Sequence, residues 1–438
     1  MSSGIELGGG AVQFGVDTQG EVPSRRAMRS GHLPAERRTP LLSAARRLLL
    51  VVFSTMLVAG VCTSTTNRIY DERFHLQRAD QITRGRPLAE VFTEPTPSAV
   101  GPIFPLVHSA VQRMSHGDVR ASRLVSLLSM ALCLGLVAEV LRKNGDDPAA
   151  SVLLFCSGPF VVSSVLALTE TLALVFGFGA FAVIWTVDRS ERPGVGRLAI
   201  AAILIGLAIL TRQSLAVLAL PLVAASISAR GFRLLDVVIL GTPSILAVLL
   251  LLSLWGGLVP PGQAGLVAKE GFAWDHVARA LAYCAVMGSL MQPTIVWSRA
   301  VALLGGAGVA VNVLAGWWTF PVLLTMFPDG GAWTEVFRRV FWGAAAGVLC
   351  GYFGTLIRAA WIERNAPAGV SCLAVTVVAI SCGLVTGEFS SRYVVAAVPF
   401  LLLISRQRTS TWGEMGGLVG ATVGFVLGLV SLRAYGLW

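Results

Sequence analysis

An acidic pair, Asp71-Glu72, directly follows the first long apolar segment of the sequence. Neighbouring residues on a helix point about 100 degrees apart, so one carboxylate can face a reactive site while the other orients the loop. A carboxylate beside an apolar membrane surface binds protons more tightly than in water, which suits a general base. From position alone, helix capping is the simpler interpretation, because acidic residues favour helix N-termini. Asp71 and Glu72 are our candidate catalytic residues.

Two later arginines, Arg212 and Arg392, are candidates for holding a phosphate, because a guanidinium presents fixed, paired donors. The alternative is that both side chains snorkel to the membrane interface. Glu170 could pair with either arginine. His75 lies four residues after Asp71 and therefore on the same helical face, yet one histidine and one carboxylate make a weak metal site. We expect neither a metal nor a cofactor.

The composition is that of a polytopic membrane protein. Of the 438 residues, 55% are hydrophobic and only 13% are charged, whereas soluble proteins carry about 25% charged residues. The apolar excess must face lipid. The net charge of +10 fits positive loops on the cytoplasmic side of a membrane better than a nucleic-acid partner, and we expect no nucleic acid to bind.

The seven cysteines lie in or at the edge of apolar segments, without a C-x-x-C pair and without companion histidines. Small, buried hydrophobic residues are the simplest interpretation of such cysteines. The sequence therefore predicts neither a metal site nor a disulfide framework.

Apolar runs of about 20 residues predict an all-α fold with about 11 to 13 transmembrane helices. Residues 1–46 read as a disordered, basic cytoplasmic tail, and residues 47–438 as one multi-pass domain. The segment 197–230 is broken by Thr211-Arg212-Gln213 and is predicted to be a pair of short helices. The other predicted spans lie near 48–64, 124–141, 149–167, 170–187, 235–257, 277–296, 300–327, 340–357, 368–386, 393–405 and 415–432.

The segment 65–122 is the large first loop between spans, and its apolar residues are spaced for short interfacial helices interrupted by prolines. Basic residues are more frequent in the connections on the N-terminal side, which places the N-terminus in the cytoplasm and this loop on the other face. The remaining polar residues gather on the loop's side of the membrane. This one-sided clustering predicts an active site that opens to the extracytoplasmic surface, where Asp71, Arg212 and Arg392 should converge.

The polar motifs together resemble one enzyme family. The run from Tyr70 to His75 resembles the Asp-Glu-x-Phe-His signature of the endoplasmic reticulum α-1,2-glucosyltransferases, and Ala79, Gln81 and the segment from Thr93 to Pro102 continue that pattern. Two departures are Glu170, where the family has Asp, and Leu215, where it has Asn. Later matches follow in the family's order: Pro159-Phe160 through Thr169-Glu170, Arg212-Gln213-Ser214, and Glu388-Phe389 with Arg392-Tyr393.

The resemblance implies a GT-C superfamily glycosyltransferase that moves a hexose, glucose in this family, from a dolichyl- or polyprenyl-phosphate sugar to a lipid-linked oligosaccharide. Asp71 would deprotonate the acceptor hydroxyl in an inverting transfer, with Glu72 as the second candidate. No general acid or metal is needed, because the leaving group is already a phosphate anion that an arginine can stabilise. The implied substrate-binding residues are His75, Glu170, Arg212, Gln213, Glu388, Arg392 and Tyr393.

Three alternatives remain open at this stage. The first is a bacterial-type transferase of the same fold that acts on a cell-envelope glycan or protein. It would lie in the cytoplasmic membrane, whereas the eukaryotic enzyme lies in the endoplasmic reticulum membrane. The second is a transporter or lipid flippase, which predicts broken helices with polar residues near the midplane of both halves. The third is a structural membrane subunit with no chemistry at Asp71.

Overall fold

Helix is the expected form of these apolar segments, because a backbone surrounded by lipid must satisfy its N–H and C=O groups internally. The computed structural model of the protein bears this out over the residues that it describes. These are residues 40–96, 98–186, 193–263, 271–295, 299–315, 366–385, 389–406 and 410–438, with isolated positions between 336 and 354. From Leu41 onward they belong to one compact unit.

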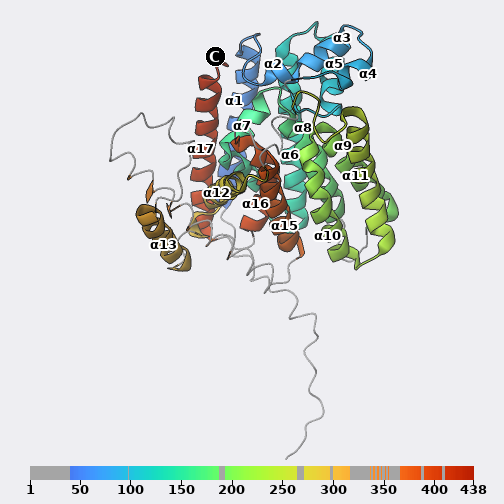
Figure 1. Cartoon of the computed structure of the whole chain (residues 1–438). Helices are drawn as coiled ribbons and strands as arrows, with labels where there is room; N and C mark the ends of the chain where they lie inside the picture. Colours follow the sequence, from blue (N-terminus) through green and yellow to red (C-terminus); the bar gives the residue numbers. More distant parts are fainter. Residues whose placement is uncertain are drawn as a thin grey trace, which may run out of the picture. The chain divides into compact units, whose positions relative to one another are not determined.

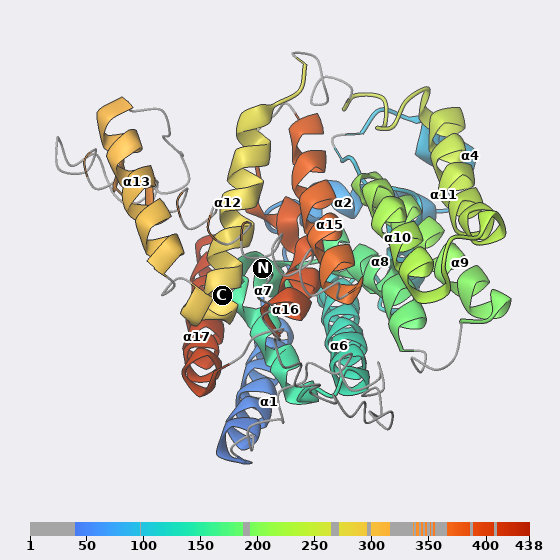
Figure 2. The ribbon, with the colours of Figure 1, turned by 90° about the horizontal axis from the view of Figure 1, so that it is seen from below.

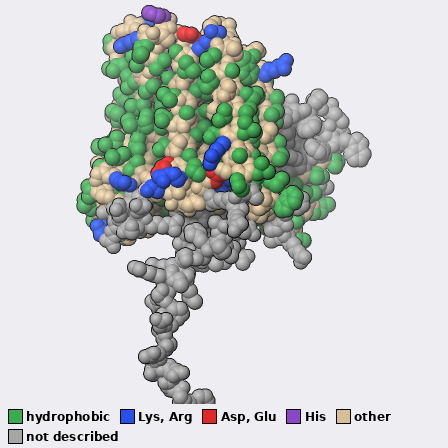
Figure 3. Space-filling view, turned by 180° about the vertical axis from the view of Figure 1, so that it is seen from behind, with side chains coloured by type: hydrophobic (Ala, Val, Ile, Leu, Met, Phe, Trp, Pro, Cys, Tyr) green, Lys and Arg blue, Asp and Glu red, His purple; other side chains and the backbone are tan. Residues whose placement is uncertain are grey.

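Four of the described helices are long and apolar enough to cross a membrane: α1 (Pro40–Thr63), α6 (Val119–Lys143), α11 (Leu234–Trp255) and α17 (Thr411–Ala434). Each coincides with a predicted span. Figure 3 shows the resulting surface, a broad band of hydrophobic side chains with charged side chains gathered mainly along its upper and lower borders. The chain is therefore a multi-pass membrane protein, as its composition predicted.

The segment predicted as a single span at 149–167 is not one continuous helix. Its residues form two short helices, η2 (Pro148–Cys156) and α7 (Gly158–Val165), which meet at an angle of 96°. Ser157 accepts a hydrogen bond from the backbone N–H of Phe160 and so begins a new helix. Pro159, in the first turn of α7, has no N–H to donate to the preceding helix, which favours the break. If the bent pair counts as one span, five elements can cross the membrane.

The predicted pair within 197–230 is confirmed, because the helix breaks at Arg212 and continues through η3 (Gln213–Leu218). Residues 277–296 and 300–327 correspond to α12 (Trp274–Met291) and, as far as described, α13 (Arg299–Ala315). The span predicted at 340–357 lies outside the described residues apart from isolated positions. Other predicted spans correspond to shorter apolar helices: α8 (Thr169–Trp185), α9 (Val195–Thr211), α10 (Ala219–Arg230), α15 (Ala366–Ser381), η6 (Cys382–Leu384), η7 (Ser391–Ala397) and α16 (Val398–Ser405).

Neighbouring helices pack in two groups that together surround the site. One runs α6, α8, α9, α11, each helix in contact with the next, and in the other α17 contacts η2, α7 and α12 (Figures 1 and 2). η7 contacts α7, α8, α12 and α15, and therefore lies between the groups. This central position lets the start of η7 reach side chains from both.

The loop at 65–122 contains short helices, as predicted. They are α2 (Glu72–His75), α3 (Gln77–Thr83), α4 (Leu88–Thr93) and α5 (Ile103–Met114), and they gather at one end of the described helices (Figure 1). We call this the loop end. Phe104, Leu76 and Val100 form a small buried cluster with Ala167 and Leu172, which packs the loop against α8 and the residues before it.

Charged residues at the opposite end from the loop tie four segments together. Arg46, in the first turns of α1, donates to Asp147 at 2.8 Å and lies 3.3 Å from Glu414 on α17. Arg406 bonds Glu414 at 3.1 Å and lies 3.5 Å from Asp146. Burial of an unpaired charge costs several kcal/mol, so this cluster fixes the positions of α1, α17, the end of α16 and the connection before η2.

Close packing of α17 depends on glycines on one of its faces. A Cβ at Gly420 would lie 2.1 Å from the carbonyl oxygen of Leu290 on α12, and one at Gly424 would lie 2.4 Å from the backbone of Cys156. Glycine is therefore the residue that lets these backbones approach, as at other small-residue interfaces between membrane helices.

Substitution of Gly424 by alanine is expected to destabilise the protein by about 1–3 kcal/mol, because the new methyl group meets backbone that cannot move aside. The melting temperature of the detergent-solubilised protein measures this. Gly135→Ala on α6 is the matched control, since nothing lies within 4 Å of its Cβ position. Equal melting temperatures for the two variants would contradict the packing argument.

Candidate functional site

Asp71 and Arg392 form an ion pair across 321 positions of sequence. Asp71 occupies the N-cap position of α2, but its side chain makes no capping hydrogen bond. It reaches instead to the guanidinium of Arg392, in the first turn of η7. The Asp71 side chain is 25% exposed and that of Arg392 is 14% exposed. The carboxylate thus retains access from outside, and capping is not how its side chain is used.

Glu170 joins this pair to a second arginine. Its Oε1 accepts a hydrogen bond from Arg212 Nη1 at 2.9 Å and lies 3.7 Å from Arg392 Nε. Arg212 Nη1 also donates to the hydroxyl of Thr169 at 2.7 Å. The groups therefore alternate in sign along a line from Asp71 through Arg392 and Glu170 to Arg212. We call these four residues the charge line.

Tyrosine rings hold both guanidinium groups of the charge line. Arg392 lies over the ring of Tyr70 at 5.1 Å, and Arg212 lies over the ring of Tyr393 at 5.4 Å. Cation–π contacts of this kind contribute about 0.5–2 kcal/mol each. They also fix the plane of each guanidinium, so the directions of its donors are set before any ligand binds.

His75 lies beside the charge line and stays neutral at pH 7. Its Nδ1 is 2.7 Å from the hydroxyl of Ser98. Burial, assisted by the positive charge of Arg392, lowers the pKa of His75 to about 4, while the carboxylates of Glu170 and Asp71 oppose that shift. A neutral imidazole offers one donor and one acceptor, so its second nitrogen can still bind a hydroxyl.

Three buried polar atoms of the predicted site residues have no hydrogen-bond partner among the described residues. They are His75 Nε2, Arg392 Nη1 and Gln213 Oε1. Buried polar atoms in native structures are nearly always paired, and each exception asks for an explanation such as a ligand or water. One imidazole nitrogen, one amide oxygen that can only accept, and one guanidinium nitrogen with its two N–H groups are therefore free to bind a polar partner.

The loop between α4 and α5 is anchored on the helix that carries Arg212. The N–H of Gly101 donates to the carbonyl of Thr211 at 3.2 Å. A Cβ at Gly101 would lie 2.2 Å from the carbonyl oxygen of Leu210, so only glycine fits at this contact. The anchored loop also carries Ser98, the partner of His75.

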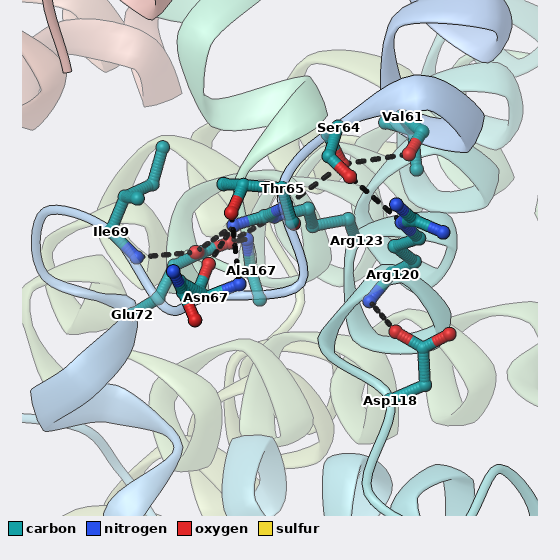
Figure 4. A network of polar contacts seen from close by, with 10 residues as sticks. All are labelled: Val61, Ser64, Thr65, Asn67, Ile69, Glu72, Asp118, Arg120, Arg123 and Ala167. Carbon is teal, nitrogen blue, oxygen red and sulfur yellow. Dashed lines mark hydrogen bonds and ion pairs between the residues drawn. The ribbon is translucent and has the colours of Figure 1, made fainter. Parts of the chain in front are cut away.

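The structure brings together six of the nine site residues predicted from sequence. They are Asp71, His75, Glu170, Arg212, Arg392 and Tyr393. Gln213 follows Arg212 in the chain at the start of η3, and its Oε1 is buried. Glu72 pairs with Arg123 instead, both side chains being 0% exposed (Figure 4). Glu388 lies outside the described residues.

Sequence reasoning missed Ser98, the role of Tyr70 as an aromatic support and the buried Arg123. Ser98 and Tyr70 carry no signal by type. Arg123 could have been found, because an arginine in the first turns of an apolar span requires a partner at that depth. Within the described ranges, no group of three metal-binding side chains lies together.

Comparisons with known proteins give one family match and two similar crystal structures. Residues 89–229 match the family model described as the MptA_B family, α-(1→6)-mannopyranosyltransferase, N-terminal domain. Comparison with curated protein sequences gives no match. The chain is also similar to the crystal structures of ArnT from Cupriavidus metallidurans in the apo state and bound to undecaprenyl phosphate. Identity is 15% in both, with TM-scores of 0.43 and 0.42, coverage of 89% and 87% of this chain, and coverage of 77% and 76% of those chains.

The lowered pKa of His75 predicts a loss of stability in acid. Its folded pKa of about 4 lies below the ordinary value of 6.5, so the unfolded chain binds a proton first as pH falls. Stability from this residue is intact above pH 6.5 and declines between pH 6.5 and 4. His75→Gln should reduce the fall in melting temperature across that window.

His108 is also buried, and its pKa of about 3 makes it a second contributor, so His108→Gln is measured in parallel. An unchanged pH profile in His75→Gln would contradict the prediction.

Proposed function

We propose that the protein is a membrane glycosyltransferase that moves a hexose from a polyprenyl-phosphate sugar to a hydroxyl of a lipid-linked glycan. The observation that carries this is the charge line, in which a part-exposed carboxylate lies next to two arginines at the end of an apolar helix bundle. The family match at residues 89–229 supports the same reaction class. A general base beside an anion-binding pair is what transfer from a phosphate-linked sugar requires.

In the proposed reaction Asp71 is the general base. The acceptor oxygen forms a bond to the anomeric carbon, and its proton passes to Asp71. The bond from the anomeric carbon to the phosphate oxygen breaks, and polyprenyl phosphate leaves with the bonding electron pair. Attack from the face opposite the phosphate inverts the anomeric configuration. No protonation of the leaving group is needed.

Donor binding would release Asp71 from Arg392. The buried Nη1 of Arg392 already lacks a partner among the described residues, and a donor phosphate offers this arginine a better acceptor than a single carboxylate oxygen. Arg212 would bind the same phosphate from the other side of Glu170. His75 Nε2 and Gln213 Oε1 would then hold sugar or acceptor hydroxyls, with Tyr393 against the Arg212 guanidinium.

Glu72 is unsuited to the base role in this scheme, because its carboxylate is fully buried and already bonded to Arg123. We therefore assign the reactive carboxylate to Asp71 and the structural one to Glu72. This assignment rests on the surroundings of the two adjacent acids rather than on their order in the sequence.

Two hexoses, glucose and mannose, are candidates for the transferred sugar. The sequence motifs resemble α-1,2-glucosyltransferases that use dolichyl-phosphate glucose, whereas the matched family model is named for an α-1,6-mannopyranosyl transfer. We therefore propose a hexose donor and test glucose and mannose side by side. The acceptor is proposed to be a lipid-linked oligosaccharide, as in N-glycosylation in the endoplasmic reticulum, or a cell-envelope glycan in a bacterial cytoplasmic membrane.

Asp71→Asn should lower sugar transfer by about 10²–10⁴-fold, because the amide cannot accept the acceptor's proton. The assay mixes purified protein with radiolabelled polyprenyl-phosphate glucose or mannose and lipid-linked acceptors, and follows label in the extracted product. Asp80→Asn is the matched control. Asp80 lies in the same loop, is 24% exposed and pairs with Arg68.

Asp80→Asn should transfer sugar at the wild-type rate. Equal transfer by wild type and Asp71→Asn would remove Asp71 as the base. If the wild-type protein transfers neither sugar but moves label across a proteoliposome membrane, the protein is a transporter or flippase and the proposed enzyme function is refuted.

Arg212→Lys should raise the KM for the donor by about tenfold or more, because lysine keeps the charge but loses the paired donors for phosphate. The KM for the acceptor should change little. Arg113→Lys is the control, since Arg113 bonds only a backbone carbonyl of the loop among the described residues. A donor KM equal to that of wild type in Arg212→Lys would place the phosphate elsewhere.

A further inference from the structure

The pair of Arg123 and Glu72 lies at the centre of a buried network at the loop end (Figure 4). Arg123, on the second turn of α6, donates from Nε to Glu72 Oε1 at 2.9 Å and from Nη2 to Glu72 Oε2 at 2.7 Å. Both side chains are fully buried. Two parallel bonds of this kind fix direction as well as distance.

The other donors of Arg123 hold the turn that leads from α1 to Asp71. Nη1 donates to the hydroxyl of Ser64 at 2.9 Å and to the carbonyl of Thr65 at 2.5 Å, and Nη2 donates to the carbonyl of Asn67 at 2.8 Å. With the two bonds to Glu72, all five N–H groups of the guanidinium are used. A lysine has only three donors and cannot reproduce this set.

Glu72 in turn holds backbone on both sides of the reactive site. Its Oε2 accepts from the N–H of Ile69 at 3.1 Å, and its Oε1 accepts from the N–H of Ala167 at 2.9 Å. Ala167 lies three residues before Glu170 of the charge line. One carboxylate thus sets the distance between the segment that carries Asp71 and the segment that carries Glu170.

The turn held in this way is strained. Tyr70 has a φ of 51°, in the left-handed region that non-glycine residues rarely adopt. Both residues next to Tyr70 in the chain are held in place. The N–H of Ile69 donates to Glu72, and the carboxylate of Asp71 pairs with Arg392. Strained backbone persists only where its surroundings determine it fully. Here those surroundings are the network, the ring of Tyr435 stacked on Tyr70 at 4.3 Å and the Arg392 guanidinium over Tyr70.

We infer that Arg123 and Glu72 are positioning residues for the proposed transfer, which set Asp71 and Glu170 at their working separation without touching the substrate. The inference rests on the proposed function. Neither side chain is exposed, so neither can contact a donor or acceptor. Their effect passes through backbone at both ends of the charge line.

Arg123→Lys should lower kcat by about 10²-fold, because a shift of roughly 1 Å in a reacting group has that effect. The donor KM should stay near the wild-type value, since Arg212 and Arg392 remain. Arg46→Lys is the matched control: Arg46 is also buried and paired with acids, but at the opposite end of the bundle. Arg46→Lys should lower the melting temperature and leave kcat unchanged.

Hydrogen exchange supplies a readout that does not depend on turnover. In Arg123→Lys, peptides covering residues 66–76 and 166–171 should exchange faster than in wild type, whereas in Arg46→Lys they should not. If Arg123→Lys does not yield folded protein, the double variant Glu72→Gln/Arg123→Gln removes both buried charges together and should show the same loss of kcat.

The outcomes separate this inference from the function on which it rests. A kcat for Arg123→Lys equal to that of Arg46→Lys overturns the positioning role, while transfer by wild type upholds the proposed function. Wild-type protein that transfers no sugar from any donor refutes the proposed function instead. The exchange comparison then decides the positioning role alone, and equal exchange in both variants would overturn it.

Discussion

Charge pairing at the end of an apolar helix bundle is the constraint on which the rest of this structure depends. The carboxylate of Glu170 is 3% exposed and the guanidinium of Arg392 is 14% exposed, so each needs a partner of opposite sign nearby. An ion left alone in such surroundings costs several kcal/mol, more than most single contacts supply. Alternation of sign along the charge line meets this need, and it also leaves donors and acceptors pointing into one small region.

The breaks in the helices follow from the same constraint. Side chains from four separate segments can meet at one level only where the helices that carry them start or stop. Glu170 lies in the first turn of α8, where the helix dipole favours an anion, and Arg212 lies at the C-cap of α9, where it favours a cation. The break after α9 and the start of η7 therefore bring the arginines of the charge line to one level, where longer, continuous helices would not.

Much of the site was predictable from residue types, because ionisable groups in a membrane protein are few and costly. Asp71, Glu170, Arg212 and Arg392 were found in this way, and their convergence followed from placing them on one face of the membrane. Which of the two adjacent acids is buried and which is part-exposed was not predictable. It depends on Arg123, which approaches Glu72 from a helix 51 positions away in sequence, and no local pattern records that approach.

The fold was predictable where a helix is long and uniformly apolar, as in α1, α6, α11 and α17. It was less so where apolar composition continues through a change of direction. The residues on both sides of the break between η2 and α7 are mostly apolar, and only Ser157 and Pro159 indicate the bend of 96°. Hydropathy predicts whether a residue can lie in lipid but does not predict the direction of the backbone. Residues that favour turns, such as serine and proline, therefore have to be considered separately.

The charge line also bears on the energetics of the proposed transfer. Two carboxylates and two guanidinium groups sum to zero, and a polyprenyl-phosphate sugar brings one negative charge. After transfer the departing phosphate has gained a second negative charge, while Asp71 has taken up the acceptor's proton and lost its own. The total charge within the site is the same before and after, so the reaction moves charge from Asp71 toward the arginines without adding any to an apolar environment. Preorganised cations aimed at the place where charge develops are the main source of such catalysis, and Arg392, which contacts Asp71 in the resting site, is the residue across which that charge would move.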